Sequence, residues 1–390
     1  MRVLTSQQLR RLDQLAQEKG RTLESLIKAA GFALVKHLPK DAKFFLFLCG
    51  PGNNGSDALV AALELLRQRG NSARVHVWDW SGSKAHLRQT LLQEVKDAGA
   101  NAMFFSGNLA SDIERLQSVL LPGTWVVDGL FGTGPLRPAS RELEAFLVAV
   151  AHSGCPVLAV DIPSGMDADT GKSWDCTLTA KITVSFAAAK PCFFIARSRA
   201  LCGQWVVEPL SFERAWIREV SGTHFAVGSN FFRQQSPPLR LWDHKKSRAS
   251  IRVLAGSPRY PGAGILAARG ALRTGLGSVV MVSEFPYKEI LKVPEVLIED
   301  IAVCDALRFP ADATLTLGSG WDVPLSSWQS KFLESLLFRS DLRIIADAGA
   351  FSWVPRQKSL SPNWILTPHS GELARMMGVE SEQIEADRWS

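Results

Sequence analysis

The sequence predicts an α/β protein of two domains, each with helices on both faces of a mostly parallel sheet. Short apolar runs of strand length alternate with longer helical patterns, which is the order of right-handed βαβ units. The alternation weakens between Glu208 and Arg248, where Gln235-Ser-Pro-Pro238 interrupts it, and then resumes. A boundary near Gln235 therefore gives a first domain of residues 1–234 and a second domain of residues 235–390.

The first domain is expected to begin with two helices before its first strand. Thr5-Ser-Gln-Gln8 resembles a capping box that starts a helix to about Lys19, and a second helical pattern covers Leu23 to His37. Strands are predicted at Phe44–Cys49, Arg74–Trp78, Trp125–Val127, Val157–Val160 and Ile182–Phe186. Helices are predicted at Ala58–Arg69, Lys84–Ala98, Leu109–Ser118 and Arg141–His152. This order predicts a three-layer, Rossmann-like domain whose binding crevice lies at the carboxyl ends of the strands.

The second domain shows the same alternation without being a close repeat of the first. A strand at Ile251–Ala255 is followed by the glycine-rich segment Gly256–Gly264 and a small-residue helix to Thr274. Further strands are predicted at Ser278–Val282, Ala313–Leu317, Leu342–Ala346 and Trp364–Leu366. From Ser370 to Arg388 we expect a helix, a turn at Gly378 and the start of another helix.

Composition and charge argue against several classes of function. Of the 390 residues, 46% are apolar and 21% are charged, and the net charge of +6 is scattered without a basic cluster. Nucleic-acid binding therefore has little support. No apolar segment is long enough to span a membrane, and the residues after Met1 do not predict a secretory signal. We expect a cytoplasmic protein with no membrane partner, and both a monomer and a homo-oligomer remain open.

The cysteines predict neither a structural metal site nor a disulfide framework. They show no CxxC pairing, and only His152 and Cys155 have a ligand-like spacing. Small buried thiols in a reducing compartment are the expected state. The six positions are Cys49, Cys155, Cys176, Cys192, Cys202 and Cys304.

The loop after the first predicted strand is the most informative segment. Gly50-Pro-Gly-Asn-Asn-Gly55 matches GxGxxG, and Asp79 lies near the end of the next strand, as in a dinucleotide-binding Rossmann fingerprint. The asparagines and Asp57 favour a different ligand, because side-chain carbonyls and a carboxylate suit a hard cation or a ribose. Asp57 has a second interpretation, as the N-cap of a helix that begins at Ala58.

Two further loops follow predicted strands, and each begins with an aspartate. Asp128 starts a loop whose glycines expose backbone N–H groups and whose last residue, Arg137, can pair with a phosphate. Asp161-Ile-Pro-Ser-Gly165 places a carboxylate and a hydroxyl three residues apart in a tight turn. Each aspartate can also be an ordinary turn former. Three aspartates at strand ends, each close to a glycine, together favour one ligand site at this edge of the sheet.

Six segments carry a resemblance to a known family. GPGNNGSDALVAA, VVDGLFGTG, VLAVDIPSGMDADTG and ITVSFAAAKP resemble, in that order, the N-terminal epimerase domain of the bifunctional NAD(P)H-hydrate repair enzymes. VLAGSPRYPGAGILAARGALRTGLGSVVMV and ILTPHSGELARMMG are similar to the ADP- or ATP-dependent dehydratase domain of that family, which has a ribokinase-like fold. The resemblance covers nearly the whole chain.

The resemblance implies a metabolite-repair function. NADH and NADPH slowly hydrate at the nicotinamide ring, and the product has two epimers. The family's first domain interconverts the R and S epimers of this hydrated NADH or NADPH. Its second domain removes water from the S epimer and uses a nucleotide, ADP or ATP, to do so.

The same resemblance implies the site residues of the first domain. The residues implied to line the hydrate site are Asn53, Asn54, Gly55, Ser56 and Asp57. Those implied to wrap the dinucleotide phosphates are Gly132, Thr133, Gly134, Pro135, Leu136, Arg137 and Pro138. Asn54, Asp128 and Ser164 match potassium ligands, which fits their oxygen-rich chemistry. Asp161 matches a substrate-contacting carboxylate and is the candidate for proton transfer during epimerisation.

In the second domain, the resemblance implies that Ala263, Gly320 and His369 bind the hydrate. On composition alone, His369 is an ordinary histidine at the end of a strand. Two positions of this domain depart from the family pattern. Asp322 replaces a glycine of a Gly-Pro-Gly-Leu-Gly pattern, and Gly349 replaces the second carboxylate of an Asp-Ala-Asp-Ala-Leu pattern.

The first loop departs from the pattern as well. It reads Gly-Ser-Asp-Ala where the family usually has Gly-Gly-Asp-Gly, so Ser56 and Ala58 add side chains. Positive φ or a close ligand approach at these positions would make those side chains costly. Lower epimerase efficiency is therefore expected.

The largest departure is at the end of the given sequence, Ser390. The family pattern continues with a Lys-Gly strand and a glycine-rich Gly-Asp motif that binds the nucleotide phosphates and supplies the catalytic aspartate. The ribokinase-like domain is therefore expected to be partial, lacking on the order of a third to two fifths of its residues. We expect its dehydratase activity to be lost or severely impaired.

Three alternatives remain beside this interpretation. One is an NAD-dependent dehydrogenase that uses Gly50 to Gly55 as its fingerprint, although two predicted helices precede the first strand. Another is a scaffold that binds hydrated NADH or NADPH without turnover. The third is a sugar or vitamin kinase built on the second domain, which would need the phosphate-binding end.

Overall fold

The chain folds into two units, Met1–Gln235 and Ser236–Ser390, and each is built on its own parallel sheet. The computed structural model describes residues 1–80, 86–222, 224–236, 238, 240–244, 248–283, 293–300, 309–354 and 359–386. Within these ranges, no helix combines the length and the apolar character that crossing a membrane requires. Lys84, Ala85 and Cys304, which belong to expectations above, lie outside the described residues.

The first unit contains a seven-stranded sheet in the order β3-β2-β1-β4-β5-β6-β7. Its strands are β1 Phe44–Cys49, β2 Arg74–Asp79, β3 Asn101–Phe104, β4 Thr124–Gly129, β5 Val157–Val160, β6 Ile182–Phe186 and β7 Gln204–Glu208. The strand order reverses between β1 and β4, which pair in parallel. In an open parallel sheet, this reversal creates a crevice at the carboxyl ends of the strands.

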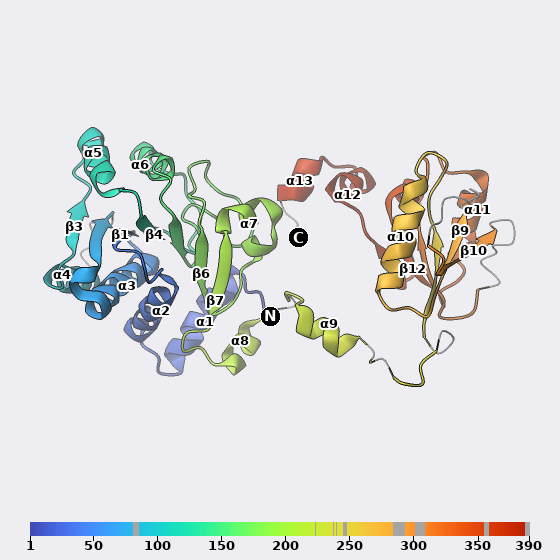
Figure 1. Cartoon of the computed structure of the whole chain (residues 1–390), viewed down its shortest axis with the longest axis horizontal. Coiled ribbons are helices and arrows are strands. Elements are labelled where there is room, and N and C mark those ends of the chain that lie inside the picture. Colours follow the sequence, from blue (N-terminus) through green and yellow to red (C-terminus); the bar gives the residue numbers. More distant parts are fainter. Residues whose placement is uncertain are drawn as a thin grey trace. The chain divides into compact units, whose positions relative to one another are not determined.

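Helices cover both faces of this sheet (Figure 1). The helices of this unit are α1 Ser6–Glu18, α2 Leu23–His37, α3 Asn53–Arg69, α4 His86–Asp97, α5 Leu109–Val119, α6 Arg141–His152, α7 Ala196–Cys202, α8 Arg214–Val220 and α9 Ser229–Gln235, of which α9 buries no residue and does not cover the sheet. Phe45 and Phe47 of β1 pack with α2, α3 and α4, whereas Leu46 and Leu48 pack with α5 and α6. Successive side chains of a strand point to opposite faces, so a strand covered on both faces is apolar throughout.

The α/β fold class and most elements of the first unit are confirmed. The capping box at Thr5 is present, and its side chain accepts from the backbone N–H of Gln8. The predicted helix Leu23–His37 and three of the predicted strands match the observed bounds. Strands β3 and β7 were not predicted, because they are short and only partly buried and lack a clear apolar run.

Helix α3 begins earlier than predicted. Its N-cap is Gly52 and not Asp57, so the interpretation of Asp57 as a cap is wrong. The residues expected to form a loop, Asn53 to Asp57, are the first turn and a half of the helix. Ser56 and Ala58 are therefore helical and lie outside the positive-φ residues, so the expected backbone strain at these two positions is absent.

The short turn between β1 and α3 depends on glycine. A Cβ at Gly50 would lie 1.7 Å from the carbonyl oxygen of Leu130, which no side chain could occupy. The backbone N–H of Gly50 also donates to the carbonyl of Gly129 at 3.1 Å. The turn after β1 thus packs directly on the turn after β4, and the two loops are held at the crevice together.

The second unit contains a six-stranded sheet in the order β10-β9-β8-β11-β12-β13. Its strands are β8 Ser250–Leu254, β9 Ser278–Ser283, β10 Val296–Asp300, β11 Thr314–Leu317, β12 Arg343–Ala346 and β13 Trp364–Leu366. Its helices are α10 Pro261–Arg273, α11 Ser327–Leu336, α12 Ser370–Met377 and α13 Ser381–Ala386. The predicted turn at Gly378 is confirmed, because this residue ends α12 in the left-handed conformation. Strand β10 was not predicted, and its burial pattern shows why, since most of its residues are exposed.

Candidate functional site

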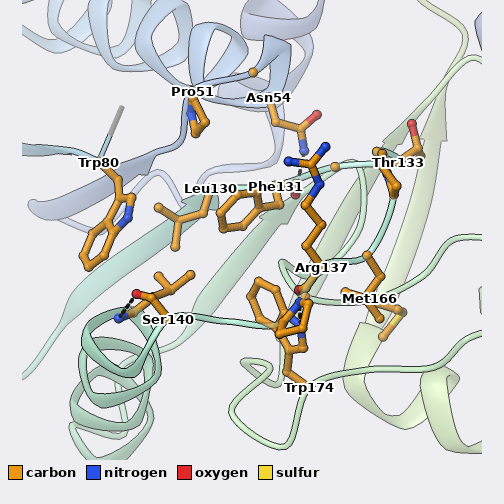
Figure 2. Close-up of a pocket in the computed structure, with 18 of the residues that line it drawn as sticks. Pro51, Asn54, Trp80, Leu130, Phe131, Thr133, Arg137, Ser140, Met166 and Trp174 are labelled. Carbon is orange, nitrogen blue, oxygen red and sulfur yellow. Dashed lines mark hydrogen bonds between the residues drawn. The ribbon is translucent and has the colours of Figure 1, made fainter. Parts of the chain in front are cut away.

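A cavity of about 600 Å³ lies at the carboxyl ends of β1 and β4 (Figure 2). Every residue from Gly132 to Pro138 lines it, as do Asn53 and Asn54 at the start of α3. Arg137 is the one charged residue among those described as lining it. A cavity of this size with backbone N–H groups and a guanidinium suits a nucleotide with its phosphates.

An indole anchors the Gly132 to Pro138 loop. The Nε1 of Trp174 donates to the carbonyl of Arg137 at 2.8 Å, and its ring meets Phe131 edge-on at 5.6 Å between centroids. A Cβ at Gly165 would lie 2.1 Å from the Trp174 ring, so the indole is seated directly on this glycine. Gly165 has φ +85, which glycine adopts without strain. The loop therefore has a fixed wall opposite α3.

Asn54, Asp128 and Ser164 meet around the backbone of Phe131. The amide of Asn54 donates to the carbonyls of Phe131 at 3.0 Å and Val160 at 2.7 Å. The Ser164 hydroxyl accepts from the N–H of Phe131 at 2.9 Å and donates to Asp128 Oδ1 at 2.5 Å. The Ser164 N–H donates to Asp128 Oδ2 at 2.9 Å. The first turn of α3, which follows β1, is thus joined to the loops that follow β4 and β5, and the three strand ends meet at one edge of the sheet.

Asp128 is a fully buried carboxylate. Burial raises the pKa of Asp128, while the hydrogen bonds from Ser164 and the Leu130 N–H lower it. Among the described residues, no cationic side chain pairs with it. A buried carboxylate beside an amide carbonyl and a hydroxyl is the oxygen donor chemistry that a potassium ion takes. These three residues therefore fit the ion that the sequence resemblance implies.

A second, smaller cavity of about 130 Å³ adjoins the first. The two cavities share Asn53, Asn54 and Thr133 in their walls. The second cavity is lined by four ionisable residues from four different segments: Asp13, Asp57, Asp161 and Lys190. A small cavity with several carboxyl groups is a candidate for proton-transfer chemistry.

Asp161 and Lys190 form a buried ion pair in this cavity. Lys190 Nζ donates to Asp161 Oδ1, to Ser185 Oγ at 2.7 Å and to the carbonyl of Phe186 at 3.2 Å. Asp161 Oδ1 also accepts from the N–H of Phe186 at 3.0 Å. Asp161 has φ 69, a conformation that is costly outside glycine and that concentrates at functional sites. The pair is therefore tightly positioned, at the end of β5.

The other two carboxyl groups have raised pKa values. Burial raises the pKa of Asp57 well above its usual range, and the nearby charges of Asp161 and Asp13 raise it further. Burial and Asp161 also raise the pKa of Asp13 to about 6, against the opposite effect of Lys190. The cavity thus contains a carboxylate in an ion pair and two carboxyl groups that retain protons more readily.

The sequence analysis did not predict two of these four residues, Lys190 and Asp13. Lys190 belongs to the quoted segment ITVSFAAAKP, but nothing local shows that its ammonium would be buried. Asp13 lies on α1, between buried leucines at Leu12 and Leu15, and resembles any solvent-facing residue of an amphipathic helix. Only tertiary contacts place them near Asp161.

Not every predicted residue reaches a cavity. Gly55 and Ser56 are buried within α3 and line neither of the two cavities. A Cβ at Gly55 would lie 2.0 Å from the carbonyl of Gly50, so this glycine serves the turn. Asp79, the acid of the Rossmann interpretation, is buried against Arg88 at 2.6 Å and does not line the larger cavity. The interpretation of Gly50 to Gly55 and Asp79 as a dinucleotide-binding Rossmann fingerprint is therefore unsupported.

In the second unit, Gly320 follows β11 and His369 follows β13, whereas Ala263 lies in the first turn of α10. A Cβ at Gly320 would lie 2.5 Å from the Cβ of Ala263, so these two positions are in close contact. His369 caps α12, where its Nδ1 accepts from the N–H groups of Gly371 and Glu372 at 3.1 and 3.3 Å. Glu372 lines a cavity of about 570 Å³ together with Tyr260, Trp321, Gly349 and Arg375. His369 is tied to that cavity through Glu372.

Two family profiles match the chain in order. The one described as YjeF-related protein N-terminus matches residues 13–192, and the one described as NAD(P)H-hydrate dehydratase matches residues 251–389. The chain is similar to the bifunctional NAD(P)H-hydrate repair enzyme Nnr of Coxiella burnetii, with 29% identity over 98% of this chain and 77% of the relative. It is 30% identical to the enzyme of the same name from Escherichia coli, over 95% of this chain and 70% of the relative. The crystal structure of yeast ynu0 covers 59% of this chain and 97% of its own, with a TM-score of 0.50 and 20% identity, and supports the fold alone.

The buried carboxyl of Asp57 predicts a pH dependence of stability in the first unit. A carboxyl whose pKa is raised on folding stabilises the fold below its unfolded pKa of about 4, and this stabilisation is lost as the pH rises through the folded value. We therefore expect Asp57→Asn to be more stable than the wild type at pH 8 and to differ less at pH 4. Thermal unfolding of both proteins at the two pH values measures this difference.

The control is Asp41→Asn, which removes an exposed carboxyl. It should leave the melting temperature nearly unchanged at both pH values, because the substitution removes an exposed side chain and no buried group. A wild type that is the more stable protein at pH 8 would contradict the assignment of a buried, unpaired carboxyl to Asp57.

Proposed function

The chain belongs to the family of bifunctional NAD(P)H-hydrate repair enzymes, and on this premise we propose that its first unit interconverts the R and S epimers of hydrated NADH and NADPH. The single observation that carries the proposal is that the two cavities adjoin and share Asn53, Asn54 and Thr133 in their walls. The larger offers the Gly132 to Pro138 loop and Arg137 to the phosphates. The smaller offers ionisable groups to the hydrated ring.

Epimerisation inverts the carbon that bears the added hydroxyl, so a bond at that carbon must break and form again on the other face. A balanced route breaks the bond between this carbon and the ring nitrogen: the hydroxyl gives up its proton as a carbonyl forms, and the nitrogen gains a proton. Closure of the ring on the other face of the carbonyl reverses both transfers, so no net proton is consumed. Groups with different proton affinities at one site can serve both halves. Asp161, in its ion pair with Lys190, is proposed to accept the proton, and Asp57, whose pKa is raised, to supply one.

Lys190 is proposed to position Asp161. Its ammonium holds one carboxylate oxygen and is itself held by Ser185 and the Phe186 carbonyl. Such a network fixes the direction of the remaining carboxylate oxygen toward the cavity that Asp161 lines. Removal of the ammonium would leave a buried carboxylate without its partner.

A potassium ion is proposed at Asn54, Asp128 and Ser164. The buried carboxylate of Asp128 supports this assignment, because it accepts hydrogen bonds but pairs with no cationic side chain among the described residues. When bound, the ion would supply positive charge close to the Phe131–Gly132 turn, where the phosphate-wrapping loop begins. Its role is then to order that loop and to balance the phosphate charge.

For the second unit, we propose a site of the dehydratase type, with ADP or ATP as the nucleotide, in which activity is lost or severely reduced. The support lies at Gly349. A Cβ at this position would lie 2.7 Å from the Cβ and 2.8 Å from the carbonyl oxygen of Trp321. The second carboxylate of the family pattern therefore has no room here, and the cavity that Gly349 and Trp321 line lacks it.

The scaffold alternative loses part of its support. Ser56 and Ala58 were one part of that support, beside Asp322, Gly349 and the partial second domain. Both are ordinary helical residues of α3 that line neither cavity of the first unit. Ala58 instead packs against β4, where a Cβ at Gly129 would lie 2.7 Å from its methyl group. These substitutions therefore give no reason to expect loss of turnover.

Asp161→Asn and Lys190→Met are expected to lower the kcat/KM for R-to-S conversion by about a hundredfold or more, because proton transfer is worth at least this factor. Pure R-hydrate in potassium buffer, followed by chromatography, measures the conversion. Lys181→Met is the matched control, since Lys181 is an exposed lysine at the start of β6 and should stay within about twofold of the wild type. Wild-type activity in Asp161→Asn would rule out the proposed acceptor.

Potassium is expected to raise the melting temperature of the wild type relative to the same concentration of choline chloride, because an ion that binds only the folded state stabilises it. Asp128→Asn should abolish this difference, and Ser164→Ala, which keeps the carboxylate, should reduce it. Thermal unfolding in the two salts measures the effect without any assay of activity. Equal melting temperatures of the wild type in both salts would contradict the potassium site.

The chain of 390 residues is expected to remove no measurable water from the S epimer in the presence of ATP or ADP. Chromatographic recovery of NADH from pure S-hydrate measures this activity, with the bifunctional enzyme of Escherichia coli as the positive control. Recovery at the rate of that relative would show that Gly349 and the other substitutions leave the dehydratase intact.

A further inference from the structure

We propose that Trp80 forms the adenine subsite of the larger cavity, so that the hydrated dinucleotide lies with its adenine on this indole and its hydrated ring at Asp161. This inference rests on the proposed function for the identity of the ligand. It adds an orientation and a recognition residue that the sequence analysis did not assign. The chemical class recognised is a flat, neutral purine.

Trp80 is held rigidly at one end of the cavity. Its backbone N–H donates to the carbonyl of Cys49 at 2.9 Å, which extends β2 by one residue beyond β1. Its ring packs on Phe105 at 4.8 Å and on Phe146 at 5.2 Å between centroids. The indole is only partly buried and lines the cavity, so part of it remains available to a ligand. A fixed aromatic surface costs little entropy when a base stacks on it.

The cavity around Trp80 is mostly apolar, and the hydroxyl of Ser140 on the same side is used to cap α6. Pro51, Leu130, Leu143 and Pro138 line the same cavity, and no carboxyl group is among its described lining residues. This part of the larger cavity suits an uncharged base and offers no carboxyl group for acid–base chemistry. The ionisable residues are instead gathered in the smaller cavity. The reacting half of the ligand therefore belongs in the smaller cavity and the adenine half in the larger.

The order of the residues along the cavity matches the order of the ligand's parts. Figure 2 shows Trp80 and Thr133 on opposite sides, with Leu130 and Phe131 between them and Arg137 on the side of Thr133. Thr133 also lines the smaller cavity. A dinucleotide that runs from the smaller cavity past Thr133 and Arg137 presents its phosphates to the loop and its second base to Trp80.

Trp80→Leu tests this assignment, since leucine keeps apolar bulk against Phe105 and Phe146 but lacks an aromatic face. Calorimetric titration with AMP should show about tenfold weaker binding in Trp80→Leu, because stacking on an aromatic side chain contributes substantially to base binding. Ribose 5-phosphate, which lacks the base, should bind both proteins equally. Trp80→Phe should retain most of the AMP affinity, and this variant also covers the case in which Trp80→Leu fails to fold.

Turnover adds a second measurement. The KM for hydrated NADH should rise by a similar factor in Trp80→Leu with kcat nearly unchanged, whereas the KM for the hydrated nicotinamide mononucleotide should not change. Trp242→Leu is the matched control, because Trp242 is 71% exposed and lines neither cavity. Equal AMP affinity in wild type and Trp80→Leu, or an equal rise in KM for the mononucleotide, would overturn the assignment.

The two proposals fail in different ways. If the wild type converts no hydrated substrate but Trp80→Leu still weakens AMP binding, the proposed epimerase function is wrong and the adenine subsite stands. If epimerisation is normal and the AMP affinity is the same in the wild type and in Trp80→Leu, the function stands and the adenine subsite is wrong.

Discussion

The site of the first unit depends on one buried carboxylate. Asp128 accepts both the N–H and the hydroxyl of Ser164, and Ser164 in turn accepts from the N–H of Phe131, whose carbonyl receives the amide of Asn54. This chain of bonds joins the loops that follow three strands of the sheet. Because each bond uses a group that is shielded from water, loss of one partner would leave another unsatisfied. The cavity walls are therefore positioned together rather than separately.

The chemistry of the site conflicts with the stability of the fold. Asp57 and Asp128 are carboxyl groups taken out of water, and burial raises the pKa of each. Removing a charge from water is unfavourable unless it gains a partner or a proton. Asp161 gains Lys190, and we assign a cation to Asp128. Asp57 is left to hold a proton, which is the property that the proposed epimerisation needs.

Most of the fold was predictable because the spacing of apolar residues along the sequence follows which side chains are buried. Fully buried parallel strands such as β1 read as continuous apolar runs, and the predicted helix Leu23–His37 matches the observed one. Prediction failed where burial is weak, at β3, β7 and β10, because an edge strand needs no apolar run. It also failed at Asn53 to Asp57, where a polar, glycine-rich segment was taken for a loop although it begins α3.

The sequence by itself determined which strand ends carry polar residues, and since parallel strands share one edge, it determined that Asn54, Asp128, Asp161 and Ser164 would gather there. Only the tertiary structure decided which residues join them. Lys190 immediately precedes the 3-10 helix Pro191–Phe194, and Asp13 lies on the amphipathic helix α1; no local pattern marks either residue. The physical reason is that the pattern of apolar residues along a strand or helix indicates which side chains are buried. The partner of a buried charge depends instead on how separate segments of the chain pack together.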